Sequence, residues 1–177
     1  MNDNCIIPEC YIDTNLIETL VPPSRGYNHQ KGCPAVAKKM KEKFTDSFAV
    51  GIMDNDKKKV SYLDEFRDIG NDGSLYVYKH RNKSHYIILI TPAVEMFVLR
   101  AAEELNIDPK ESGIPVTLEE LKRETKQIDA KSSKKYAAFF KKLQAAKEFK
   151  KLAELVSYLK KENYNAQDSC ILDILED

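Results

Sequence analysis

Short apolar runs alternate with segments of helical spacing over the first hundred residues, and this alternation limits the fold more than any other feature of the sequence. The clearest run is FAVGIM at 48–53, which ends directly in three polar residues. Strands that alternate with helices are typical of βαβ units, in which parallel strands form one sheet covered by helices. The sequence therefore predicts an α/β fold with a layered, mostly parallel sheet flanked by helices.

The individual elements follow from periodicity and from turn and cap residues. We expect strands at 5–12, 48–53, 75–78 and 85–90, and a weaker one at 27–30. Helices are expected at 16–20, 34–44 and 92–105, with a short one within 62–69. The segment 80–84 is expected to be a turn or a short loop between two strands.

Beyond residue 116 the chain becomes rich in lysine. Residues 117–162 carry 13 Lys/Arg against 7 Asp/Glu, whereas residues 163–177 carry none against 4. Thr117 and Glu120 have the spacing of a capping box, and breaks near 129–132 and 144–146 divide the segment into helices. We expect an α/β domain over 1–116, a helical extension over 117–162 and an acidic tail over 163–177. The basic helices either present a solvated face or meet a phosphate backbone.

Five acidic residues lie at the ends of predicted strands or just beyond them: Glu9, Asp13, Asp54, Asp56 and Glu95. In open α/β sheets, sites form at the carboxyl ends of the strands. Asp54 and Asp56 are two residues apart and can both present oxygens to one hard cation such as Mg²⁺ or Mn²⁺. The alternative is that Asp54-Asn55-Asp56 is a turn, since Asp and Asn favour turns.

This arrangement resembles the Toprim fold, in which a Glu follows the first strand, an Asp stands four residues later, and a DxD follows the third strand. The matching segments are PECYID at 8–13 and VGIMDND at 50–56. ITPAVEMFVL at 90–99 resembles the P-x-x-E helix of Toprim-like nucleases of the overcoming-lysogenisation-defect type and of their small single-domain relatives. Cys10 departs from the pattern, because the family usually has Gly there.

A second, weaker resemblance is to PIN-domain ribonucleases, which open with a strand followed by D-T-N and an apolar helix. The matching segment is CYIDTNLIETL at 10–20. PIN domains place more helix between their acidic residues than 21–47 can provide, so the Toprim-like interpretation is preferred.

Both resemblances imply phosphotransfer on DNA or RNA that depends on Mg²⁺ or Mn²⁺. The implied catalytic residues are Glu9 and Asp54, and the implied metal ligands are Glu9, Asp13, Asp54, Asp56 and Glu95. Lysines expected to contact nucleic acid are Lys57, Lys134, Lys135, Lys141, Lys142, Lys150 and Lys151. The alternative function is a non-catalytic module whose helical extension binds a protein partner.

Several other classes of protein are disfavoured by the sequence. The four cysteines form no CxxC pair, which argues against structural zinc and disulfides. With 6 glycines there is no phosphate loop or dinucleotide fingerprint, so no nucleotide cofactor is expected. His29, His80 and His85 lack metal-ligand spacing and are expected to be ordinary polar residues. Without a signal peptide or an apolar run of roughly 18 to 20 residues, the chain is expected to be soluble, cytoplasmic and free of membrane partners.

Overall fold

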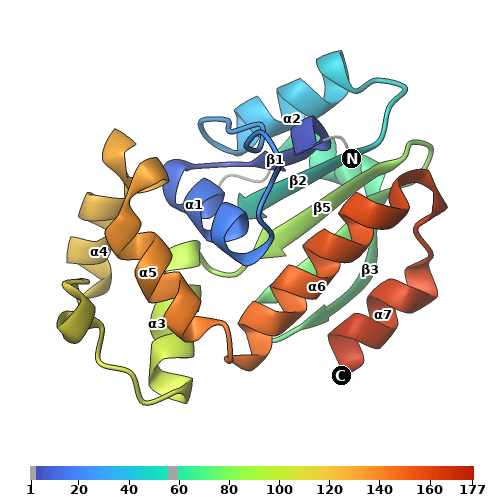
Figure 1. The fold of residues 1–177 in the computed structure, drawn as a ribbon. Coiled ribbons are helices and arrows are strands. Elements are labelled where there is room, and N and C mark those ends of the chain that lie inside the picture. The colour runs from blue at the N-terminus through green and yellow to red at the C-terminus, as the bar shows by residue number, and fades with distance from the viewer. Residues whose placement is uncertain (1–2, 56–59) are drawn as a thin grey trace.

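The computed structural model describes residues 3–55 and 60–177, and in this part of the chain five strands form one open sheet flanked by helices (Figure 1). The strands are β1 (Ile6–Pro8), β2 (Ala49–Asp54), β3 (Phe66–Asp72), β4 (Leu75–His80) and β5 (His85–Ile90). The helices are α1 (Tyr11–Leu20), α2 (Cys33–Lys43), α3 (Val94–Glu104), α4 (Leu118–Thr125), α5 (Lys134–Leu143), α6 (Lys147–Glu162) and α7 (Asp168–Glu176). The predicted α/β class is confirmed.

The sheet is mixed, so the expectation of a mostly parallel sheet is wrong. Its strand order is β1-β2-β5-β4-β3, with β1, β2 and β5 parallel and with β4 antiparallel to both β5 and β3. Only Gly73 and Ser74 separate β3 from β4, and 81–84 alone separate β4 from β5. Such short connections can join only antiparallel neighbours, because a parallel crossover needs a dozen or more residues.

Two predicted elements differ from the structure. The segment 27–30 is not a strand, although the amides of Asn28 and Gln30 donate to the carbonyls of Ile6 and Pro8 along the outer edge of β1. The helix expected within 62–69 is a single 3₁₀ turn, Ser61–Glu65, followed directly by β3. Partly exposed β3 carries few apolar residues, and for this reason its sequence lacks the signal of a buried strand.

The first predicted strand is shorter than expected. β1 ends at Pro8, and α1 begins three residues later at Tyr11, with Cys10 as its N-cap. Pro8 has no amide hydrogen to continue the ladder, so a strand end is the position where proline is tolerated. This early end matters for the site, because it places Glu9 in the turn between β1 and α1.

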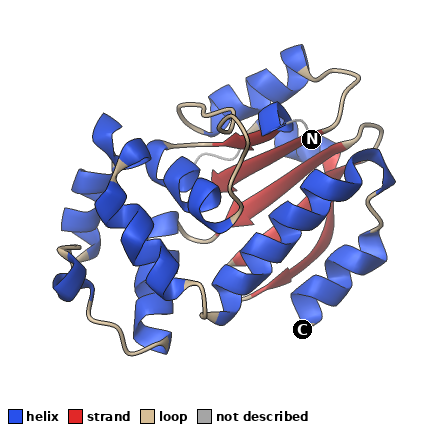
Figure 2. Cartoon of the chain, in the orientation of Figure 1, coloured by secondary structure: helices blue, strands red, loops and turns tan. Residues whose placement is uncertain are grey.

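Alternate residues of the strands pack on opposite faces of the sheet. Ile6 and Ile88 belong to the larger apolar core, which also contains residues of α1, α3, α5, α6 and α7. Ile7 and Ile87 belong to a smaller core formed with α2 and Tyr62. The two faces follow from the period of two along a strand. Figure 2 shows the sheet between these helical layers.

The helical extension packs directly against the sheet and shares its larger core. Thr117 caps α4 by accepting a hydrogen bond from the amide of Glu120, as the capping-box spacing predicted. A 3₁₀ turn at 128–132 and the break between α5 and α6 lie where breaks were expected. The acidic segment beyond residue 162 contains α7, which contacts β3.

Candidate functional site

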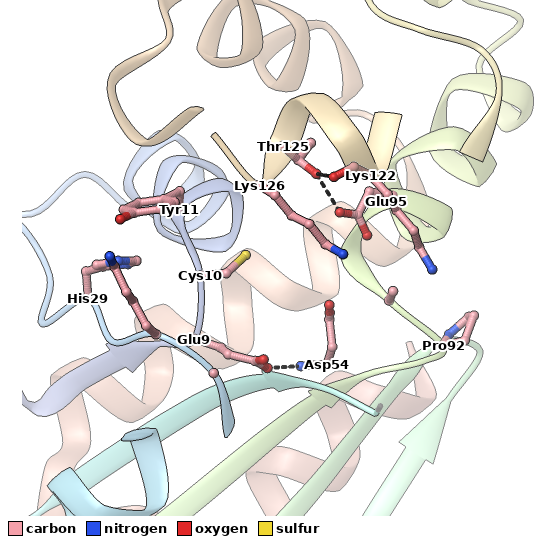
Figure 3. A pocket seen from close by; sticks show the side chains of 13 residues that line it. Glu9, Cys10, Tyr11, His29, Asp54, Pro92, Glu95, Lys122, Thr125 and Lys126 are labelled. Carbon is pink, nitrogen blue, oxygen red and sulfur yellow. Dashed lines mark hydrogen bonds between the residues drawn. The ribbon is translucent and has the colours of Figure 1, made fainter. Parts of the chain in front are cut away.

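A pocket of about 330 Å³ lies at the carboxyl ends of the three parallel strands (Figure 3). This is the edge of the sheet at which α/β proteins form their sites. The lining comes from the turn after β1, the loop before α2, the end of β2, the start of α3 and from α4. The lining residues are Glu9, Cys10, Tyr11, His29, Lys31, Gly32, Asp54, Pro92, Ala93, Glu95, Lys122, Thr125 and Lys126.

Glu9 connects the ends of β1 and β2. Its own amide donates to the carbonyl of Ile52, which extends the pairing of the strands by one residue. Its Oε2 accepts hydrogen bonds from the amide of Asp54 at 2.8 Å and from the thiol of Cys33 at 3.0 Å. Burial raises the pKa of the Cys33 thiol, so Cys33 is a neutral hydrogen-bond donor here. Glu9 is therefore held at the pocket by three separate contacts of the backbone and side chain.

Asp13 is buried in the first turn of α1, next to the lining residue Cys10, and does not itself line the pocket. Its Oδ2 accepts a hydrogen bond from the amide of Cys10, which caps the helix, whereas its buried Oδ1 has no hydrogen-bond partner among the described residues. Burial raises the pKa of Asp13 above the usual value of an aspartate, and the nearby carboxylates of Glu9 and Glu95 raise it further. The structure therefore contains a buried carboxyl oxygen that lacks a partner.

Asp54 lies at the last position of β2 and points into the pocket (Figure 3). Its Oδ1 accepts a hydrogen bond from the amide of Val94 at 2.9 Å. Burial raises the pKa of this carboxyl, and the charges of Asp13, Glu9 and Glu95 raise it too. Mutual repulsion of this kind arises when carboxylates share one site of low dielectric.

Glu95 comes from the first turn of α3 and is buried. Its Oε1 accepts a hydrogen bond of 2.6 Å from the hydroxyl of Thr125, at the end of α4. This contact holds α4 against the pocket. In Figure 3 the side chain of Lys126 extends toward Asp54 and Glu95, whereas that of Lys122 passes Glu95 toward Pro92. Neither lysine forms an ion pair within the described residues.

Three of the five predicted acidic ligands, Glu9, Asp54 and Glu95, therefore line one pocket although they are far apart in the sequence, and a fourth, Asp13, is buried near them. Asp56 and Lys57 lie outside the described residues. Sequence reasoning missed the pocket residues Tyr11, Lys31, Lys122, Thr125 and Lys126, and it treated His29 as an ordinary polar residue. The four-residue spacing of Lys122 and Lys126 places them on one face of α4, but nothing local indicates which element that face meets.

The basic residues predicted from the extension do not line this pocket. As expected, five of them are exposed: Lys134, Lys135, Lys141, Lys142 and Lys150. Two of these are engaged, since Lys135 pairs with Glu124 and Lys142 donates to the hydroxyl of Ser112. Lys151 was expected at the surface and is instead 3% exposed. Its ammonium pairs with Asp72 and donates to the carbonyl of Leu175. Lys151 is therefore a structural residue between α6 and α7.

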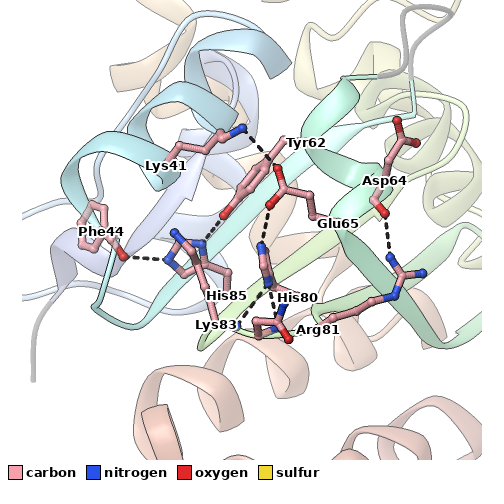
Figure 4. A network of polar contacts seen from close by, with 10 residues as sticks. Lys41, Phe44, Tyr62, Asp64, Glu65, His80, Arg81, Lys83 and His85 are labelled. Atoms are coloured by element: carbon pink, nitrogen blue, oxygen red, sulfur yellow. Dashed lines mark hydrogen bonds and ion pairs between the residues drawn. The ribbon is translucent and has the colours of Figure 1, made fainter.

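The two remaining histidines lie at the opposite end of the sheet and belong to a closed network (Figure 4). His85 contacts the hydroxyl of Tyr62 through Nδ1 and the carbonyls of Phe44 and Ser47 through Nε2. Nε2 of His80 lies 3.1 Å from a carboxyl oxygen of Glu65. Every ring nitrogen of this pair is engaged, which agrees with the expectation that these histidines are ordinary polar residues.

The donor atoms at the acidic pocket suit a hard divalent cation. Glu9, Asp54 and Glu95 offer only carboxyl oxygens, which Mg²⁺ and Mn²⁺ prefer, and the nearby Asp13 adds a buried oxygen without a partner among the described residues. Within 3–55 and 60–177, however, no group of three His, Cys, Asp or Glu side chains is already arranged to hold a metal ion. Side chains such as Glu95, which is bound to Thr125, would have to rotate to take up such a cation.

No helix within the described residues has the length and apolar character needed to span a bilayer. Comparison with protein-family models, with curated proteins and with solved structures finds no match to this chain.

Proposed function

We propose that this protein is a nuclease with a Toprim-like site, which uses Mg²⁺ or Mn²⁺ to hydrolyse phosphodiester bonds in nucleic acid. The observation that carries the proposal is the convergence of Glu9, Asp54 and Glu95 in one pocket at the carboxyl ends of parallel strands, with the buried carboxyl of Asp13 near enough to raise the pKa of Asp54. These acids come from three separate segments, since Glu9 and Asp13 both belong to the junction of β1 and α1, so turn and cap preferences alone do not account for their meeting.

Electrostatics supports the same proposal. Like charges that share a buried site destabilise one another, and either protons or a bound cation relieve the repulsion. In the absence of a cation, the pKa values of Asp13 and Asp54 are raised, which means that these carboxyl groups bind protons more readily and so reduce the repulsion. A divalent cation held by these carboxylates would polarise a phosphoryl oxygen and lower the pKa of an attacking water.

The protein itself contributes positioning and charge. Glu9, Asp13, Asp54 and Glu95 would hold the cation, and Asp54 would carry most of this role because its carboxyl points into the pocket and interacts with all three other acids. Lys122 and Lys126 lie on the opposite side, free of ion pairs with described carboxylates, and can bind the non-bridging oxygens of a phosphodiester. Carboxylates that can bind a cation and lysines that can bind a phosphate therefore lie around one pocket, as the binding of a metal ion together with a phosphodiester requires.

The decisive experiment measures the thermal midpoint of unfolding with and without Mn²⁺, in the wild type and in Asp54→Asn. A cation that binds only the native state stabilises it by about 2.7 kcal/mol at a concentration 100 times its Kd. This stabilisation corresponds to a rise of roughly 5–11 °C for a chain of this size. Asp54→Asn should lose the rise, because asparagine keeps the shape and loses the charge. The matched control is Asp46→Asn, which changes an exposed aspartate outside the pocket and should keep it.

Cleavage of labelled single-stranded and duplex DNA and RNA in Mn²⁺ then tests the reaction itself. Cleavage that persists in Asp54→Asn would remove this residue from the mechanism. A PIN-like ribonuclease would use the same acids and would cleave RNA alone. Absence of both the metal shift and cleavage would favour the second candidate, a protein-binding module. The exposed lysines of α5 and α6 support that candidate, and reversing the charges of Lys134, Lys141, Lys142 and Lys150 would then abolish partner binding.

A further inference from the structure

An aromatic pair forms one side of the acidic pocket. The rings of Tyr11 and His29 are stacked, with centroids 4.6 Å apart and planes 18° from parallel, and both residues line the pocket. Figure 3 shows them beside Glu9, on the side of the pocket away from Glu95 and the α4 lysines. Tyr11 packs at the margin of the larger apolar core and His29 belongs to neither core, and both residues are partly exposed. Core packing therefore accounts for part of the Tyr11 ring, but it does not account for the stacked His29.

The hydrogen bonds of His29 define its tautomer. The hydroxyl of Thr14 donates its single hydrogen to the carbonyl of Cys10 at 2.7 Å, so its contact of 3.0 Å with Nδ1 of His29 requires the ring to donate. Nε2 is then an acceptor in the neutral ring, and it has no hydrogen-bond partner among the described residues. A buried acceptor without a donor costs free energy, so the contacts within the described residues do not satisfy this ring.

A cation stands next to the aromatic pair. Nζ of Lys31 lies 5.5 Å from the ring centroid of Tyr11, and the side chain is exposed at the edge of the pocket. Aromatic side chains on which bases stack, combined with lysines that follow the phosphates, are the usual means of binding single-stranded nucleic acid. The pocket thus has aromatic rings on one side, lysines of α4 on the other side, and carboxylates between them.

We propose that Tyr11, His29 and Lys31 form a subsite for one unpaired nucleotide, whose base stacks on the aromatic pair while its phosphate lies between the carboxylates and the α4 lysines. This proposal rests on the proposed function, because it names the substrate of the same site. It also explains the size of the pocket: about 330 Å³ is at the small end of ligand sites and accommodates one nucleotide, whereas a base inside a duplex has both faces covered by its neighbours.

The test compares the affinity of the protein for a short fluorescein-labelled single strand and for the duplex of the same sequence, by fluorescence anisotropy at fixed ionic strength. Both DNA and RNA versions are used. Tyr11→Leu, which removes the ring, should weaken binding of the single strand about tenfold and leave duplex binding within about twofold. Tyr11→Phe keeps the ring and should keep the affinity. The matched control is Tyr76→Leu, on β4 at the other face of the sheet, which should change neither affinity.

Failure of this inference and failure of the proposed function give different results. If Mn²⁺ still stabilises Tyr11→Leu but the preference for single strands is unchanged, the subsite is wrong and the metal site stands. Equal loss of single-strand and duplex binding also overturns the subsite, since it indicates a general effect on the pocket. If Tyr11→Leu selectively loses single-strand affinity in a protein without a Mn²⁺ shift, the subsite stands and the reaction is wrong. His29→Leu provides a second variant where Tyr11→Leu does not fold.

Discussion

A buried ion pair links the first residues of the chain to the last long helix, and its removal has a calculable effect. Nζ of Lys160, on α6, lies 2.6 Å from a carboxyl oxygen of Asp3, and both side chains are buried. Lys160 also donates to the hydroxyl of Tyr27, and the carboxyl of Asp3 accepts from the amides of Ser24 and Arg25. The ammonium of Lys160 is the main cause that lowers the pKa of Asp3.

Lys160→Met should destabilise the protein by about 3 kcal/mol. Breaking a buried pair from one side costs roughly 3–5 kcal/mol, because it leaves an uncompensated charge in the interior. The lower end applies, since Asp3 keeps its two backbone donors and methionine fills most of the space of the lysine stem. For a chain of this size the loss corresponds to a fall of roughly 6–12 °C in the thermal midpoint. Urea denaturation at neutral pH measures the free energy directly.

The double variant Asp3→Asn/Lys160→Met should recover most of the loss, because no unpaired charge then remains and asparagine still accepts from the amides of Ser24 and Arg25. Lys161→Met, at the next position, is the matched control: the Lys161 side chain is 74% exposed, and its ion pair with Glu162 should contribute less than about 1 kcal/mol. A loss below about 1 kcal/mol in Lys160→Met, or a double variant no more stable than the single one, would refute the reasoning.

Three further predictions concern the site and its support. Because the pKa of Asp13 is raised to about 7 and that of Asp54 to about 10, the stability that their protonated forms contribute is complete below the ordinary value of 3.8 and is lost as pH rises through the raised values. Urea titrations without metal should show stability falling from about pH 4 to 7 and less steeply above, with a smaller fall in Asp54→Asn. Thr125→Val should cost about 1–3 kcal/mol in the same assay, since it leaves the buried Glu95 without its donor. Gly51→Ala should cost about 1–3 kcal/mol, because a Cβ there would lie 3.0 Å from atoms of α2, and an unchanged urea midpoint would show that α2 shifts freely.

Much of the fold was predictable because its signals are local. The run at 48–53 is apolar on both faces and had to be a buried strand, and β2 is buried at every position from Ala49 to Met53. Thr117 and the break near 144–146 marked a helix start and a helix end that depend only on neighbouring residues. β3 was missed because it is an edge strand with exposed residues, so its pairing with β4 decides its conformation more than its composition does.

The site divides in the same way. The positions of Glu9 and Asp54 could be predicted, because each directly follows or ends a strand that the sequence indicates. β1 and β2 are parallel neighbours, so their carboxyl ends bring these two residues to the same edge of the sheet. The opposite side of the pocket could not be read from the chain. The sequence does not distinguish Lys126 from the many other lysines of the basic segment. Only the packing of α4 against the pocket, through the hydrogen bond between Thr125 and Glu95, places Lys126 there.

Lys151 and Lys160 show the limit of sequence reasoning most clearly. Helical spacing separates apolar from charged positions, and on that basis every lysine of α6 faces solvent. In the folded chain α7 and the N-terminal segment cover these two, and Asp72 and Asp3 neutralise them. Periodicity within a helix thus determines which residues share a face, whereas the segments that pack over that face from distant parts of the chain determine what each residue meets.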